Sequence, residues 1–161
     1  MKRYAVAAVL AVFCGVLVAS ASTDGYAKEL TLTVKGYAGT EVLTNFPVLV
    51  RLSETKVPGF RYADFKSSGK DIRFALPDGT GLAYDCDTWN PSGESLFWVK
   101  VPALTKGLRF KMFYGKGEDE GAGSAKATWS SYVGVWHENE SGNGTRTVVD
   151  STGNGISGTS S

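Results

Sequence analysis

Apolar and polar residues alternate along several short segments of the chain, and turn-forming residues separate these segments. In residues 29–35, Leu30, Leu32 and Val34 point to one side and threonines to the other. Residues 107–114 repeat this pattern with larger side chains. A period of two is typical of a strand with one face on a core. Both segments are therefore predicted to be half-buried strands.

Two further segments, residues 46–52 and 95–101, are apolar on both faces. Residues 95–101 are expected to be a central strand that is covered on both sides. In residues 46–52, Pro47 is tolerated because it lies near the strand start. Residues 71–76 and 82–88 are joined by a turn rich in proline and glycine. They are predicted to pair with each other as a hairpin.

Six strands with short connections and almost no helical periodicity predict an all-β fold, an antiparallel β-sandwich of jelly-roll or immunoglobulin-like type. A barrel is also compatible with the spacing. The two segments that are apolar on both faces favour the sandwich. The 20 glycines and the aromatic content of 12% agree with a turn-rich β protein.

The N-terminus has the three parts of a secretory signal peptide. Lys2 and Arg3 are followed by an uncharged apolar run, and Ala19 and Ala21 supply the small residues of a cleavage site. We expect cleavage after Ala21, so that residues 1–21 are the signal peptide. An uncleaved membrane anchor is the alternative, although the run is short for a span of roughly 20 apolar residues.

Removal of this segment changes the charge and the cysteine count. The 17 basic residues fall to 15 because Lys2 and Arg3 are lost, and against 16 acidic residues the net charge becomes −1. This balance argues against a nucleic-acid partner and against docking on anionic lipid, and we expect no stable membrane insertion after cleavage. Only Cys86 is left, so the mature chain has no internal disulfide.

The strand pattern stops after Tyr114. We therefore expect a β domain over residues 22–116 and a glycine-rich linker over residues 117–131. Residues 132–161 begin with a short strand at 132–136 and continue as a tail of Gly, Ser, Thr and Asn. This tail is too poor in apolar residues to fold alone, so it is predicted to be disordered.

Several short motifs follow one another in a specific order. They are TNFPVLV at 44–50, GKDIRF at 69–74, LAYD at 82–85, Trp89, LFWVKVP at 96–102 and MFYG at 112–115. Together they resemble the family known as domain of unknown function 2341, over about residues 29–116. The resemblance implies a β module of secreted or envelope bacterial proteins.

The tail has a resemblance of its own. VWHENE at 135–140, VDSTGNG at 149–155 and GT at 158–159 are similar to the entry of a concanavalin A-like or laminin-G-like domain. Members of the first family often precede such domains, or stand at the front of proton-channel subunits of biopolymer transport systems. We expect residues 132–161 to be the truncated start of a lectin-like domain, in a truncated gene product or fragment.

Polar candidates for a site gather around the predicted hairpin, where Asp71, Arg73, Asp85 and Asp87 lie on neighbouring strands. Arg73 and the carboxylates are predicted either to grip a hydroxylated ligand or to form an internal ion pair that fixes the hairpin. Asp85 and Asp87 share a face at about 6.6 Å, a spacing that glycoside hydrolysis tolerates. Any Asp-x-Asp on a strand gives this spacing, so no catalytic residue is assigned.

Among the aromatic residues, Trp89 is the candidate for stacking on a sugar ring, because it lies at a strand end beside a turn. Trp98 is expected in the core. His137 is followed by Glu138 and Glu140, but a rigid metal site needs more ligands. Oxygen-rich turns such as residues 78–80 have the atom type that binds calcium, but the sequence has no EF-hand loop. No cofactor is therefore assigned.

The sequence thus predicts a non-catalytic, exported β module located in the periplasm, on the outer surface or outside the cell. Its expected role is that of an adhesive or carbohydrate-contacting accessory domain of a bacterial surface or secreted protein, with a polysaccharide or an envelope protein as partner. One alternative is a structural or assembly domain that binds other envelope proteins in biopolymer transport. The other is a glycoside hydrolase fragment.

Overall fold

The computed structural model describes residues 25–65, 69–117, 123–140 and 144–160. The predicted signal peptide lies outside the described residues. Within them, no helix has the length and apolar character needed to cross a membrane.

Strands are the main regular structure of the described chain, and its two helices are short. The helices are η1 (Tyr62–Asp64) and α1 (Ala125–Thr128). The strands are β1 (Lys28–Thr33), β2 (Leu43–Leu52), β3 (Arg73–Ala75), β4 (Gly81–Leu82), β5 (Tyr84–Thr88), β6 (Ser95–Leu104), β7 (Arg109–Tyr114), β8 (Arg146–Val148) and β9 (Gly158–Ser160).

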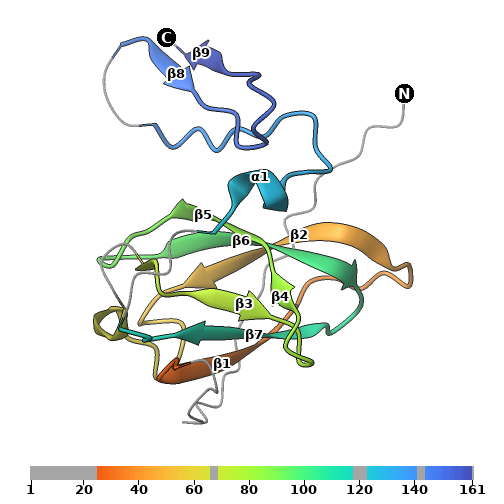
Figure 1. Cartoon of the computed structure of the whole chain (residues 1–161), viewed down its shortest axis with the longest axis vertical. Helices are drawn as coiled ribbons and strands as arrows, with labels where there is room; N and C mark the ends of the chain where they lie inside the picture. Colours follow the sequence, from red (N-terminus) through yellow and green to blue (C-terminus); the bar gives the residue numbers. More distant parts are fainter. Residues whose placement is uncertain (1–24, 66–68, 118–122, 141–143, 161) are drawn as a thin grey trace.

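Two antiparallel sheets pack face to face (Figure 1). One sheet has the strand order β1-β7-β3-β4, and the other has the order β2-β6-β5. The predicted all-β antiparallel sandwich is confirmed. β8 and β9 form a separate two-stranded hairpin beyond α1.

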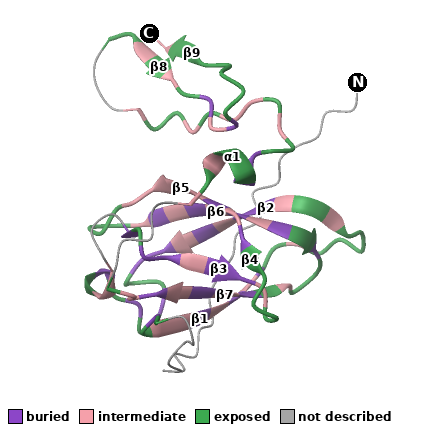
Figure 2. Cartoon of the chain, viewed as in Figure 1, coloured by how far each residue is buried: buried purple, intermediate pink, exposed green. Residues whose placement is uncertain are grey.

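Alternating side chains from both sheets fill the space between them, and the buried residues of the sandwich concentrate there (Figure 2). Leu30 and Leu32 of β1 are fully buried, as their alternation with threonine predicts. In β6, Phe97 and Val99 point into the core. β2 is an edge strand, where the missing N–H of Pro47 leaves no gap in a central ladder.

The predicted hairpin between residues 71–76 and 82–88 is wrong beyond Leu82. β4 pairs with β3 through Leu82 and Phe74, but the chain then crosses to the other sheet, where β5 pairs with β6. The crossing takes place at Ala83, whose carbonyl already accepts a hydrogen bond from the Lys100 amide at 2.9 Å. The predicted strand at residues 82–88 is therefore divided between the two sheets. Leu82 stays in the sheet of β3, and residues 84–88 join the sheet of β6.

The chain after the sandwich also differs from the prediction of a linker and a disordered tail. Ser124 caps α1, since its hydroxyl accepts a hydrogen bond from the Ala127 amide at 3.2 Å. Residues 124–139, which we call the docked segment, then lie against the outer face of β5 and β6. The strand predicted at residues 132–136 does not form, because side chains rather than a ladder hold this segment.

Asp150 organises the last part of the described chain. Its carboxylate accepts hydrogen bonds from the backbone amides of Val135, Thr152 and Ile156. Burial acts to raise the pKa of Asp150, but a hydrogen bond from the Thr152 hydroxyl, together with these backbone bonds, lowers it. Order in this polar stretch comes from side-chain to backbone hydrogen bonds, so the shortage of apolar residues does not prevent it.

Candidate functional site

Asp85 and Asp87 of β5 lie together on the outer face of the three-stranded sheet, and both contact His137. The Nε2 atom of His137 lies 2.8 Å from Oδ2 of Asp85, and its Nδ1 atom lies 3.2 Å from Oδ2 of Asp87. The register of β5 against β6 shifts between Cys86 and Thr88, which leaves Asp87 as an extra residue in the strand. The prediction that the two carboxylates share a face agrees with this arrangement.

Two indole groups complete the hydrogen bonding of the same carboxylates. The Nε1 atom of Trp129 donates to Asp85 at 2.7 Å, and that of Trp98 donates to Asp87 at 3.1 Å. Asn139 adds a hydrogen bond from its amide nitrogen to the Asp87 carbonyl at 2.8 Å. Each carboxylate therefore joins the sheet to the docked segment.

An aromatic contact supports this polar cluster. The Trp129 ring packs edge-to-face against Trp98, with ring centroids 5.5 Å apart, and only 4% of Trp129 is exposed. Trp98 thus lies on the outer face of β6, not in the central core where the sequence places it. The prediction that residues 95–101 are covered on both faces is met in part, because the core buries one side and the docked segment leaves the other side half-buried.

The charged groups of the cluster shift the pKa values of their partners. Burial alone would lower the pKa of His137, but the hydrogen bonds and charges of Asp85 and Asp87 outweigh it and raise the pKa to about 9. Burial alone would raise the pKa of Asp87, but bonds from His137 and Trp98 lower it to about 2. At neutral pH an imidazolium ion therefore lies between the two carboxylates.

Cys86 lies between the two aspartates in sequence and packs against the core. Burial, together with the negative charges of Asp85 and Asp87, raises the pKa of its thiol to about 11. The thiolate is the reactive form of cysteine, so Cys86 behaves as a small apolar residue, as predicted.

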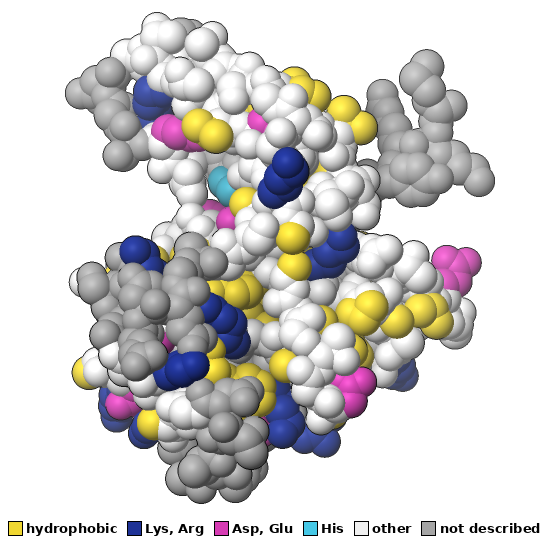
Figure 3. Space-filling view, in the orientation of Figure 1, with side chains coloured by type: hydrophobic (Ala, Val, Ile, Leu, Met, Phe, Trp, Pro, Cys, Tyr) yellow, Lys and Arg dark blue, Asp and Glu magenta, His cyan; other side chains and the backbone are white. Residues whose placement is uncertain are grey.

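The cluster is largely enclosed, and only a small part of the histidine, drawn in cyan, is visible on the face of the molecule that Figure 3 shows. The side chains of Asp85, Asp87 and His137 are each 13% exposed. A pair of carboxylates that cleaves a glycosidic bond must flank its substrate. Here the imidazole of His137 occupies that space, so the pair binds a segment of its own chain.

Arg73 does not join these aspartates. It lies in β3 of the opposite sheet, where its guanidinium donates to the carbonyl of Ile72 at 2.6 Å and to the hydroxyl of Tyr84 at 3.1 Å. Asp71 is fully buried and accepts a hydrogen bond from the Gly115 amide at 3.0 Å. The predicted grouping of Arg73 with Asp85 and Asp87 is wrong, because the chain changes sheets at Ala83.

Trp89, the predicted sugar-stacking residue, packs against the edge of the core. Its ring lies edge-to-face with Tyr62 at 5.2 Å and with Phe65 at 5.4 Å. Gly69 lies so close that a Cβ atom there would be 2.4 Å from the ring. These neighbours cover much of the Trp89 ring, so the ring is poorly placed to stack on a ligand.

Sequence reasoning missed the roles of Trp129 and His137. Both residues lie in a stretch without a hydrophobic period, so the pattern gave no reason to place them on the sheet. One signal was available. His137 is the only histidine, and the Asp85-x-Asp87 pair on one strand face offers it two carboxylates.

Comparison with known proteins finds one family. Residues 68–148, which are 81 of the 161 residues, match the family model described as Domain of unknown function (DUF2341). The match includes β3 to β7 and the docked segment, and it crosses the domain boundary predicted at residue 116. No curated protein and no solved structure matches the chain.

Proposed function

Because the chain belongs to the family Domain of unknown function (DUF2341), whose description assigns no activity, we propose a function from the geometry of the site. The protein is a non-catalytic, extracytoplasmic β module of a bacterial surface or secreted protein. Its role is structural. It holds the chain that follows the sandwich in a fixed position on the outer face of β5 and β6.

The observation that carries this proposal is the use of the cluster around Asp85 and Asp87. The two carboxylates and the Trp98 indole belong to the sheet, and the Trp129 indole and the His137 imidazolium belong to the docked segment. The cluster therefore binds a segment of the chain itself. A buried charge is costly unless it is paired and hydrogen-bonded. These groups therefore favour one position of the docked segment over all others.

The extracytoplasmic part of the proposal rests on the N-terminal pattern of two basic residues, an apolar run and Ala-Ser-Ala. N-terminal sequencing of the exported protein, which we expect to begin at Ser22, tests this part. A protein that is kept in the cytoplasm with its first residues intact would contradict it.

Other functions have weaker support. A sugar contact through Trp89 competes with the packing of that ring against Tyr62 and Phe65. A glycoside hydrolase that uses Asp85 and Asp87 would first have to remove His137 from between them. The structural role that we propose needs no such change in the contacts of Trp89 or His137.

We expect the double variant Asp85→Ala, Asp87→Ala to free the docked segment. Without the carboxylates, His137, Trp129 and Asn139 lose their side-chain acceptors on β5. Backbone NMR order parameters report the effect: values near 0.85 in the native docked segment should fall below about 0.6 in the variant. The β8–β9 hairpin should gain the same mobility, because the docked segment connects it to the sandwich.

The matched control is Asp78→Ala. Asp78 is an exposed carboxylate in the turn between β3 and β4, and it accepts a hydrogen bond from the Thr80 amide at 2.9 Å. This change should leave the docked segment rigid. Equal rigidity in the double variant would show that the aspartates do not hold the segment, and the proposal would fail.

A further inference from the structure

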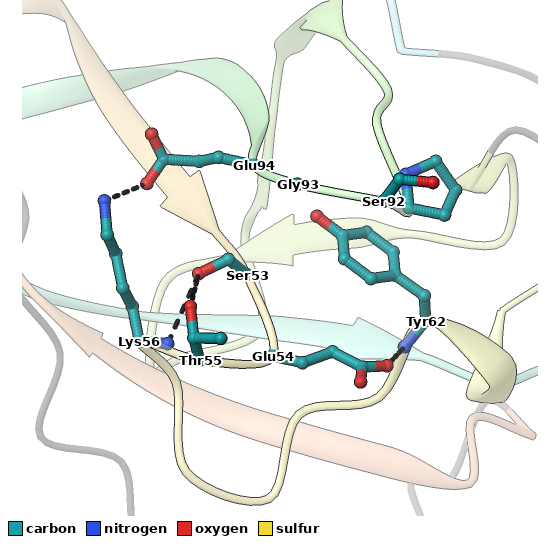
Figure 4. A pocket seen from close by; sticks show the side chains of 9 residues that line it. Ser53, Glu54, Thr55, Lys56, Tyr62, Ser92, Gly93 and Glu94 are labelled. Carbon is teal, nitrogen blue, oxygen red and sulfur yellow. Dashed lines mark hydrogen bonds and ion pairs between the residues drawn. The ribbon is translucent and has the colours of Figure 1, made fainter.

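An open hollow of about 460 Å³ lies at the end of the sandwich where β2 ends and β6 begins (Figure 4). The loop at residues 53–56 forms one side, and the turn at residues 91–94 forms the other. Tyr62 lies between them. A volume of this order falls in the range of small-molecule sites, which begins near 300 Å³.

The walls of the hollow are held in place. The hydroxyl of Tyr62 donates to the Leu52 carbonyl at 2.8 Å and accepts a hydrogen bond from the Ser95 amide at 3.1 Å. Across the rim, the ammonium group of Lys56 lies 2.8 Å from a carboxylate oxygen of Glu94. These bonds connect the two loops to each other and to the ends of β2 and β6.

The charged groups around the hollow are paired with one another. Glu94 is paired with Arg51 as well as with Lys56. Glu54 accepts a hydrogen bond from the Tyr62 amide at 2.8 Å and lies 4.0 Å from the guanidinium of Arg61. The two carboxylates and the three basic groups are thus all engaged in ion pairs, so these groups present no unpaired charge to an ionic ligand.

The hydrogen-bonding capacity of the same groups is only partly used. A carboxylate has about four lone-pair positions, an ammonium has three donors, and a hydroxyl both donates and accepts. Thr55 and Ser92 bring exposed hydroxyls to opposite sides of the hollow, and Pro91 adds an apolar surface. Mixed donors and acceptors beside an apolar wall, with the charged groups already in ion pairs, match a molecule that carries many hydroxyls on a carbon ring.

We propose that this hollow is a binding site for a neutral, polyhydroxylated ligand such as a sugar unit of an uncharged polysaccharide. The site is separate from the docked segment and does not depend on the proposed structural function. It also differs from the sugar contact that the sequence suggests, because Trp89 packs beneath Tyr62 and has no place in the lining.

The test uses the full chain and a panel of neutral oligosaccharides, with saturation-transfer NMR to detect binding and calorimetry to measure Kd. Ser92→Trp should fill the hollow and weaken binding at least about tenfold. The control Thr105→Trp places the same ring on an exposed threonine in the β6–β7 turn, at the other end of the sandwich, and should leave Kd unchanged. If Ser92→Trp fails to fold, Thr55→Ala combined with Ser92→Ala removes two hydroxyls and should also weaken binding.

Three results would overturn the proposal. The first is that the native chain binds none of the neutral oligosaccharides. The second is binding that the Ser92 variants do not change. The third is tighter binding of inorganic phosphate or glucosamine than of any neutral sugar, since this would show that the hollow selects charge.

Discussion

Replacing Trp129 by alanine should release residues 124–139 from the sheet while the sandwich stays folded. Trp129 is 4% exposed, donates to Asp85 and packs against Trp98. Removing a buried tryptophan costs about 3–5 kcal/mol. The sandwich core lies on the opposite face of β6, so this loss falls on the docking of the segment.

Amide hydrogen exchange measures this effect directly. Local opening that becomes easier by about 3 kcal/mol should speed exchange in the docked segment by at least about 100-fold. Amides of β6 and β7 should keep their protection. Trp136→Ala is the control, because Trp136 is 42% exposed and outside the contact with Trp98. Unchanged exchange in the Trp129 variant would mean that the indole does not hold the segment.

The same substitution at Trp89 should act on the whole sandwich. Trp89 contacts Tyr62, Phe65 and Phe97, which belong to or pack against the central core. Its removal leaves a cavity at the edge of the core, and we expect the free energy of unfolding to fall by about 3 kcal/mol. Denaturant unfolding should show a lower midpoint with an unchanged slope.

Trp136→Ala again serves as the control and should change stability by less than about 0.5 kcal/mol. A Trp89→Ala variant that keeps native stability but loses oligosaccharide binding would restore the ligand role that the sequence suggests. Loss of stability with unchanged affinity would place the residue in the core.

The hydrophobic pattern predicted the sandwich because its strands have one buried face. In β1 and β7 the inward positions alternate with polar residues, so both strands and their buried sides follow from a period of two. β6 was predicted to be covered on both faces, and its outer face is half-buried. What covers its outer face could not be predicted, since Trp129 stands alone among small and polar residues.

The change of sheet at Ala83 was not predictable from the same pattern. Residues 82–88 continue the strand signal without a turn residue, and the pattern does not say which neighbour a strand pairs with. This crossing determines which of the candidate residues lie together. It leaves Arg73 in one sheet and carries Asp85 and Asp87 to the other, where they meet His137.

The docked segment escaped prediction for a different reason. It is held on the sheet by a few charged and aromatic side chains, whose partners are at least 27 residues away in sequence. Local composition contains no information about such contacts. The sequence can nominate the lone histidine and the paired aspartates, but only the fold brings them together.

The charges of this cluster also set the pH range in which docking is strongest. The pKa of His137 rises from its ordinary value of 6.5 to about 9, so its contribution is complete below about pH 6.5 and is lost as the pH rises through 9. The pKa of Asp87 falls from 3.8 to about 2, so its contribution is present above about pH 4 and is lost as the pH falls through 2. Docking should therefore be strongest between about pH 4 and pH 6.5.

NMR titration of the His137 imidazole tests the central claim most directly, because His137 is the only histidine in the chain. If the imidazolium lies between Asp85 and Asp87, its pKa in the native chain is about 9. In the Asp85→Ala, Asp87→Ala variant it should return toward 6.5. A pKa near 6.5 in the native chain would contradict the account, since it would show that the docked segment does not reach the two aspartates.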